Sequence, residues 1–337
     1  MTTALITGIT GMVGSHLADY LLEKTDWKIV GLQRWRSPLD NISHLLERVN
    51  NDDRIKLVYG DLRDTLSIDK VIENAKPDYV FHLAAQSFPK TSFDAPLDTL
   101  DTNIQGTTRV LEAVRQHRPD AIVHVCSSSE VFGRVPIEKL PIDEDCTFHP
   151  ASPYAISKVG TDLVGRFYAE AYGINVMTTR MFTHTGPRRG DVFAESSFAK
   201  QIALAEAGFI KPIIRVGNLK SLRTIADVRD AVHAYFLLVT INPQAGEYYN
   251  IGGQYTLEVG GILDHLISLS PLKREFKIEI DANRLRPIDA DLQVPNTSKF
   301  MQHTGWAPQI SFEQTMQDLL EYWRKRVTLE GNRFLQR

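Results

Sequence analysis

The chain of 337 residues is long enough for one large domain or two modest ones, and its 43% hydrophobic and 23% charged residues are typical of a globular protein. Its 38 basic and 41 acidic residues give a net charge of −3, so the total charge does not indicate a protein that binds nucleic acid. Two cysteines, Cys126 and Cys146, exclude a disulfide framework and favour a reducing, cytoplasmic location. We see no signal-peptide pattern and no apolar run long enough for a membrane span, so we expect neither export nor membrane insertion.

Short apolar runs alternate with longer segments of helical period through the first half of the chain. The runs lie at 4–6, 28–32, 55–59, 79–83, 121–125 and 174–177. Runs that are apolar on both faces and separated by helices predict a parallel sheet with helices on both sides. The predicted fold class is therefore α/β, a Rossmann-like doubly wound parallel sheet.

The alternation becomes irregular after about residue 182, where prolines punctuate shorter elements. We predict a first domain over 1–182, with returning segments at about 220–255. A smaller, partly discontinuous domain is expected over about 183–219 and 256–330. The helical period of 225–239 and the strand-like run 247–251 are the segments expected to return to the first sheet.

A glycine turn separates the first predicted strand from a helix that opens near Met12. Gly8, Gly11 and Gly14 would let backbone amides at that helix N-terminus approach a pyrophosphate, which predicts a dinucleotide site. The spacing departs from G-x-G-x-x-G, so a purely structural turn stays an alternative. The residues expected at the cofactor are Gly8, Thr10, Gly11, Met12, Val13 and Gly14.

The end of the second strand distinguishes NADP from NAD. It carries Arg34, Arg36 and Ser37 and no carboxylate, which favours NADP because guanidinium groups match phosphate oxygens. A solvated loop with two unrelated arginines is the alternative. After the third strand, Asp61 and Leu62 are placed to meet the adenine, although Asp61 could equally cap the next helix.

Four residues suggest acid–base chemistry. Tyr154 and Lys158 lie one turn apart in the predicted helix 152–172, and we expect the ammonium to lower the pKa of the phenol. At the end of the fifth strand, Ser128 can bind a substrate oxygen, and Glu130 can remove a proton next to a ketone. A chance pair on a helix, a serine turn and an exposed loop glutamate are the alternatives.

These residues belong to motifs that resemble a known superfamily over nearly the whole chain. The glycine turn, His82-Leu83-Ala84-Ala85, Asn103, the run 127–133 and the Tyr154/Lys158 pair resemble the extended branch of the short-chain dehydrogenase/reductases. Within it, the runs 34–37, 85–87, 128–130, 182–184 and 186–190, with Arg286-Pro287, resemble the GDP-mannose 4,6-dehydratases. The runs 198–202, 216–219 and 227–230 resemble the GDP-4-keto-6-deoxymannose reductases at least as much.

The resemblance implies that the first domain binds NADP and the second a GDP-linked sugar. It adds Leu83, Ala84, Ala85, His184, Tyr154 and Lys158 as cofactor contacts. It implies substrate contacts at Ser87, Ser129, Thr183, Arg188, Arg223, Arg286 and Asp289. Three positions depart from the family pattern, which has asparagine at Thr183, lysine at Ser197 and aspartate at Thr224. These departures allow a different hexose, or a heptose, on the nucleotide.

The implied dehydratase reaction begins when Tyr154, assisted by Lys158 and Ser128, removes the proton of the sugar 4-hydroxyl while hydride passes to NADP. Glu130 then removes the C5 proton, water leaves from C6, and the same NADPH returns the hydride to C6. In the reductase alternative, NADPH reduces a preformed 4-ketone and Glu130 has no required step. A nucleotide-sugar epimerase and a non-catalytic, cofactor-bound regulator are the remaining alternatives.

Metal ions, nucleic acid and membranes are not expected as ligands. The histidines show no compact ligand spacing with a carboxylate, so no metal site is predicted. The resemblance implies a homodimer or homotetramer, with the apolar helix faces at 99–114 and 158–172 as the interface. Burial of those faces within one subunit is the alternative.

Overall fold

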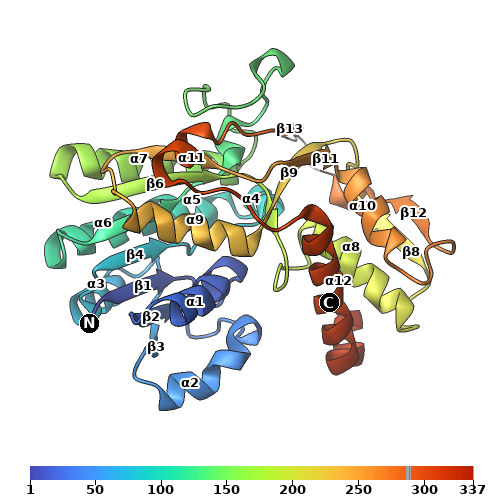
Figure 1. Ribbon diagram of the computed structural model, residues 1–337, viewed down its shortest axis with the longest axis horizontal. Helices are drawn as coiled ribbons and strands as arrows, with labels where there is room; N and C mark the ends of the chain where they lie inside the picture. The colour runs from blue at the N-terminus through green and yellow to red at the C-terminus, as the bar shows by residue number, and fades with distance from the viewer. Residues whose placement is uncertain (286–287, 289, 337) are drawn as a thin grey trace.

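The structure is a computed structural model that describes residues 1–285, 288 and 290–336. Its first layer is a seven-stranded parallel sheet (Figure 1). Its strand order is β10-β6-β5-β4-β1-β2-β3. The bounds are β1 (Thr3–Thr7), β2 (Lys28–Gln33), β3 (Ile55–Tyr59), β4 (Tyr79–His82), β5 (Ile122–Cys126), β6 (Asn175–Met181) and β10 (Tyr248–Ile251). All six predicted apolar runs form strands, and the predicted fold class is confirmed.

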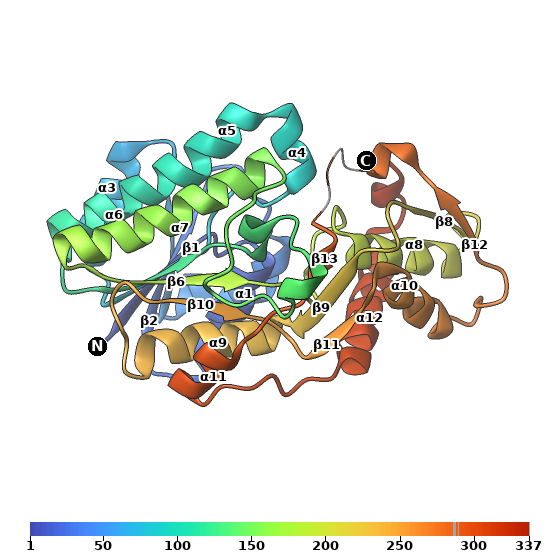
Figure 2. The same cartoon turned by 90° about the horizontal axis from the view of Figure 1, so that it is seen from above.

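Helices cover both faces of this sheet, as Figure 2 shows. Leu5 of β1 packs into the core under one set of helices, whereas its neighbours Ala4 and Ile6 pack into the core on the other face. This alternation explains why the strand is apolar throughout. One face carries α3 (Thr65–Ala75), α6 (Gly106–His117) and α7 (Pro153–Tyr172), and the other carries α1 (Met12–Lys24) and α9 (Val228–Thr240).

Shorter helices connect these elements on the first sheet's side of the molecule. They are a 3-10 helix η1 (Asp40–Leu45), α2 (Leu46–Asn51), α4 (Pro89–Asp94), α5 (Pro96–Leu100), a π-helix (Asp101–Gln105), two 3-10 helices (Ser129–Phe132 and Ile137–Lys139) and α11 (Ser298–Thr304). The π-helix interrupts the predicted helical segment 99–114. Phe300 of α11 and Trp306 join the core beneath the first sheet, although we predicted the smaller domain for this part of the chain.

A second region lies beside the carboxyl edge of the sheet and has its own apolar core. Three helices build that core: α8 (Ala194–Glu206), α10 (Val259–Ser268) and α12 (Phe312–Glu330). Its strands are β7 (His184–Thr185), β8 (Ile213–Val216), β9 (Leu222–Asp227), β11 (Tyr255–Glu258), β12 (Lys277–Ile280) and β13 (Leu292–Gln293). The 3-10 helices Ala282–Arg284 and Gly331–Gln336 complete it.

The sequence placed the start of one helix three residues too early. We predicted helix over 225–239, but β9 continues to Asp227 and α9 begins at Val228. The physical reason is a cap: the Asp227 side chain accepts a hydrogen bond from the Arg229 amide, so the chain is extended up to that residue.

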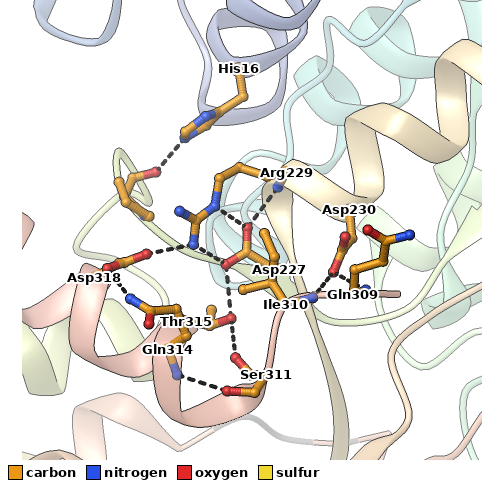
Figure 3. Close-up of polar contacts among 11 residues, drawn as sticks. His16, Asp227, Arg229, Asp230, Gln309, Ile310, Ser311, Gln314, Thr315 and Asp318 are labelled. Atoms are coloured by element: carbon orange, nitrogen blue, oxygen red, sulfur yellow. Dashed lines mark hydrogen bonds and ion pairs between the residues drawn. The ribbon is translucent and has the colours of Figure 1, made fainter. Parts of the chain in front are cut away.

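Side chains at the start of α9 hold the C-terminal helix in place (Figure 3). Asp227 accepts a hydrogen bond from the Thr315 hydroxyl of α12 at 2.8 Å. Arg229 bridges Asp227 and Asp318 of α12 at 2.7 and 2.6 Å. Asp230 accepts hydrogen bonds from two backbone amides of the loop before α12. These contacts fix the second region against a helix of the first sheet.

No helix of the described residues is long and apolar enough to cross a membrane.

Candidate active site

A cleft of about 1380 Å³ opens at the carboxyl edge of the first sheet, and residues of both regions line it. Open α/β sheets bind their ligands at this edge. The four residues that the sequence suggested for acid–base chemistry all line the cleft: Ser128, Glu130, Tyr154 and Lys158. The strand ends and the start of α7 therefore bring together residues that are 30 positions apart in the chain.

The glycine turn forms one end of the cleft, and its geometry fits a dinucleotide. Gly8 has φ +75°, and a Cβ atom at Gly14 would lie 2.3 Å from the Gly8 carbonyl oxygen. The close approach of α1 to the turn therefore requires glycine, and it leaves the helix N-terminus open to a pyrophosphate. Of the other predicted cofactor contacts, the cleft is lined by Gly11, Met12, Val13, Leu83, Ala85 and His184. Thr10 lies in the glycine turn, where its carbonyl oxygen accepts a hydrogen bond from Asn41 Nδ2. Ala84 follows β4 and packs beside the turn, with its amide donating to Thr7 Oγ1.

The two arginines after β2 are exposed, and neither guanidinium forms an ion pair with another residue that the structure describes. The Ser37 hydroxyl accepts a hydrogen bond from the Arg34 amide at 3.2 Å, which closes the turn. Arg34 also lies close enough to Asp61 to help lower the pKa of that carboxyl, although the hydrogen bond from Arg63 is the larger cause. Unpaired guanidinium groups at this strand end fit the 2′-phosphate of NADP.

The structure separates the two interpretations of the segment after β3. Asp64, and not Asp61, is the N-cap of α3, because its side chain accepts a hydrogen bond from the Leu66 amide. Asp61 instead pairs with Arg63. The Leu62 side chain is buried in the core, where it leaves room only for glycine at position 106. Contacts of Asp61 and Leu62 with adenine stay a prediction.

Hydrogen bonds connect the residues that the sequence suggested for acid–base chemistry. The Ser128 hydroxyl accepts a hydrogen bond from the Glu130 amide at 3.2 Å and caps the 3-10 helix that begins at residue 129. The Ser128 and Tyr154 side chains are hydrogen-bonded to each other. The Lys158 ammonium donates to the Cys126 carbonyl oxygen at 2.7 Å. These contacts fix the orientation of all three side chains within the cleft.

The expected pKa shift of Tyr154 is wrong in direction. Burial raises the pKa of its phenol above the ordinary value of 10, and the hydrogen bond from Ser128 and the charge of Arg189 only partly oppose this. Burial also lowers the pKa of Lys158, and its ammonium is bound to the Cys126 carbonyl. A helical spacing of four residues places the two groups on one face, but it does not encode how deeply they are buried.

The predicted substrate contacts do not all occupy the same place. Ser87, Ser129 and Thr183 line the cleft, as does Arg223, whose Nη1 donates to the Ala290 carbonyl oxygen at 2.8 Å. Arg188 also reaches the cleft wall, but its guanidinium forms an ion pair with Asp19 of α1 at 2.7 Å. Arg286 and Asp289 lie outside the described residues.

The structure adds cleft residues that the sequence analysis missed. The Arg189 side chain is 15% exposed, and its Nε lies 3.3 Å from Glu195 Oε1 on the first turn of α8. Arg284 Nη1 donates to Ser197 Oγ at 2.9 Å, so a guanidinium lies where the resemblance implies a lysine. Two adjacent arginines, Arg188 and Arg189, could have suggested a charged group at the cleft, but the sequence alone does not say which of them faces it.

Comparisons with known proteins agree with this geometry. The family model described as GDP-mannose 4,6 dehydratase matches residues 5–319. GDP-mannose 4,6 dehydratase 1 of Arabidopsis thaliana is 33% identical over 326 residues, which cover 94% of this chain and 88% of that protein. GDP-6-deoxy-D-mannose reductase of Pseudomonas aeruginosa is 30% identical, over 96% and 98% of the two chains. The structure of RMD from Pseudomonas aeruginosa complexed with NADPH superposes with a TM-score of 0.81, at 27% identity over 97% of this chain and 100% of that chain. By its sequence and its fold, the chain belongs to the GDP-mannose 4,6-dehydratase family.

Proposed function

We propose that the protein is an NADP-dependent GDP-sugar 4,6-dehydratase that converts GDP-mannose, or a related GDP-hexose or heptose, to the 4-keto-6-deoxy sugar. The observation that carries the proposal is the carboxylate of Glu130 in the cleft beside Tyr154, close enough to raise the pKa of that phenol. A simple reductase needs the tyrosine, lysine and serine but no further base. An elimination needs one.

The first step falls to Tyr154. Tyr154, hydrogen-bonded to Ser128, would remove the proton of the sugar 4-hydroxyl, and the charge of Arg189 would favour its phenolate form against the effect of burial, with Lys158 in the same cleft. Bound NADP supplies a hydride acceptor for C4 and later a hydride donor for C6. The exposed Arg34 and Arg36 would hold its 2′-phosphate, and the turn at Gly8 and Gly14 its pyrophosphate.

Glu130 would carry out the second step. A ketone at C4 makes the C5 proton acidic, and the carboxylate can take that proton while the C6 hydroxyl leaves as water. Because C4 is oxidised and C6 is reduced, the net redox change is zero. Glu130 can pass that proton to the departing C6 hydroxyl, and Tyr154, protonated in the first step, can supply the proton for C5, which restores both groups for the next cycle.

Cationic side chains of the second region would bind the substrate diphosphate. Arg284 and Arg223 line the cleft, and the Ser197 hydroxyl orients the first of them. Lys200 also lines the cleft, although Asp191 neutralises its ammonium at 2.7 Å. Guanidinium groups suit a diphosphate because they bind two oxygens at once. Arg284 would thus supply the charge that Ser197 lacks.

A 4-keto reductase is the second candidate, because the reductase relative matches over 98% of its own length. Incubation of the purified protein with GDP-mannose and NADP distinguishes the two, with mass spectrometry as the readout. Loss of one water is expected. No loss, combined with oxidation of NADPH by the 4-keto sugar, would replace the dehydratase with the reductase.

The Glu130→Gln variant tests the assigned base directly. We expect elimination to fall by about 10²- to 10⁴-fold, because a positioned acid–base group contributes a factor of that size. Glu138→Gln is the matched control, since Glu138 is exposed on the next 3-10 helix. Unchanged elimination in Glu130→Gln would remove the role of this residue, whereas an effect of similar size in both variants would indicate a folding defect.

We further propose a homodimer that pairs α7 with its copy in a second chain. Four large apolar side chains of α7 are about half exposed: Ile156 at 49%, Leu163 at 48%, Phe167 at 53% and Tyr172 at 48%. A row of this kind on a surface helix is typical of an interface. Analytical ultracentrifugation of Leu163→Glu should show monomers if the proposal holds.

The free thiols of Cys126 and Cys146 support a reducing, cytoplasmic location.

A further inference from the structure

Glu195 is a buried carboxylate that faces the cleft from the first turn of α8. It is only 6% exposed, and it lines the cleft together with the catalytic tyrosine. Its Oε1 atom has no well-aligned hydrogen-bond partner among the described residues. Arg189 Nε lies 3.3 Å away in an ion pair, and this contact is too poorly aligned to use all the lone pairs of that oxygen.

An ionised carboxylate in such a position is costly unless its oxygens accept hydrogen bonds. The charge of Arg189 and the N-terminus of α8 offset part of that cost. They leave lone pairs of Oε1 unused, however, and a carboxylate can only accept. A ligand that brings an O–H or N–H group into the cleft would supply the remaining partner.

The surroundings place Glu195 near the reacting end of the ligand. Arg189 lies close enough to Tyr154 and to His184 to lower the pKa of both groups. The backbone of Arg189 is fixed as well, because its carbonyl accepts a hydrogen bond from Ser196 Oγ at 2.7 Å. That hydroxyl in turn accepts from Trp323 Nε1 at 2.9 Å, so α12 braces the segment that holds the ion pair.

The charge of Glu195 also argues against contact with the diphosphate. A carboxylate repels phosphate oxygens, whereas the cations Arg284 and Arg223, which also line the cleft, attract them. The ribose hydroxyls and the guanine N–H groups are also uncharged donors, but Glu195 is paired with Arg189, which lies near Tyr154, and the glycosyl ring must reach that tyrosine to react. The hydroxyl groups of the glycosyl ring are the natural donors to Glu195.

We propose that Glu195, oriented by Arg189, accepts a hydrogen bond from a hydroxyl group of the glycosyl ring and thereby determines which sugar the enzyme takes. The inference rests on the proposed function in one respect, that the ligand is a GDP-linked sugar. Sugars that lack this hydroxyl, or that carry a carboxylate near it, would be rejected because the buried acceptor would be left unpaired or repelled.

Binding to the NADP-loaded protein tests this without requiring turnover. Isothermal titration calorimetry would compare GDP-mannose with GDP for the wild type, Glu195→Ala and Glu195→Gln. We expect Glu195→Ala to weaken GDP-mannose binding by about 10- to 100-fold, the size of a lost hydrogen bond to a charged group, and to leave GDP binding within about twofold. Glu195→Gln keeps the side-chain volume and a neutral acceptor, so a smaller loss is expected.

The matched control is Glu313→Gln, because Glu313 occupies the first turn of α12 in the same way but is exposed. It should bind both ligands as the wild type does. An equal loss of GDP and GDP-mannose affinity in the Glu195 variants would show that Glu195 does not contact the glycosyl ring and would overturn the proposal.

Monodeoxy analogues of GDP-mannose give the second readout. The wild type should discriminate against the 2-deoxy or the 3-deoxy sugar, and Glu195→Ala should lose that discrimination for one of them. If both proteins discriminate equally against every analogue, Glu195 contacts no hydroxyl. Selective binding with no loss of water from GDP-mannose would refute the dehydratase function and leave the role of Glu195 intact.

Discussion

A methyl group at position 14 would collide with the backbone of the glycine turn. The Cβ atom of Gly14→Ala would lie 2.3 Å from the Gly8 carbonyl oxygen and 2.8 Å from the Ile9 Cα. The carbonyl cannot easily tilt away, because it already accepts a hydrogen bond from the Gly11 amide at 3.0 Å. The start of α1 must therefore move by about 1 Å, which costs about 1–3 kcal/mol of folding free energy.

The same movement displaces the amides that would face the pyrophosphate. We expect NADP affinity to fall by about 10- to 100-fold, since each 1.4 kcal/mol corresponds to a factor of ten. Calorimetric titration with NADP and urea unfolding measure the two effects. Gly260→Ala is the control, because it adds the same methyl group in the first turn of α10 with no atom closer than 3.4 Å. Wild-type NADP affinity in Gly14→Ala would refute the explanation of this turn.

Three further predictions concern charge. Burial lowers the pKa of His16 from 6.5 to about 4, so the unfolded chain binds more protons than the folded chain between these pH values. The free energy of unfolding should therefore fall as the pH drops from 6.5 to about 4, by up to about 1.4 kcal/mol per pH unit for this group. Urea unfolding of His16→Asn should show a shallower pH slope, and an unchanged slope would contradict this assignment. Asp162 lies 2.8 Å from the buried Arg180, and Asp162→Asn removes this counter-ion. The variant should lower the free energy of unfolding by about 3–5 kcal/mol, and a loss below about 1 kcal/mol would show that the ion pair does not stabilise the fold. The double variant Arg34→Ala, Arg36→Ala should lose about 10- to 100-fold of its preference for NADP over NAD in calorimetric titrations, and an unchanged ratio would place the 2′-phosphate elsewhere.

The first layer could be predicted because its signals are local. A strand such as β1 is apolar on both faces, and the glycine turn directly follows it, so the sheet edge and the cofactor end of the cleft can be located from spacing alone. The same reasoning places Ser128 and Tyr154 together, since Ser128 follows a strand that ends at that edge and Tyr154 lies in the first turn of a helix that begins there. The boundary between β9 and α9 was misplaced because a single side chain, that of Asp227, decides it.

The substrate end of the cleft could not be predicted in the same way. Glu195 and Arg284 come from separate elements of the second region, and only the packing of α8 and the loop after β12 brings them to the cleft. The predicted direction of the Tyr154 pKa shift was wrong for a related reason, because burial depends on distant segments that close over the phenol. Sequence spacing records which residues are neighbours on one helix and says nothing about the dielectric around them.

The strand order also constrains how the protein is made. β10 is an outer strand of the sheet and pairs with β6, yet the chain builds residues 182–247 between them. On a ribosome, which releases the chain from its N-terminus, β6 must wait with an unpaired edge until residues 248–251 emerge. Such an edge can recruit strands from other nascent chains. The largely buried β6 is therefore a point at which overexpression would divert the protein into aggregates, and slower synthesis or a lower temperature would change how long its edge stays unpaired.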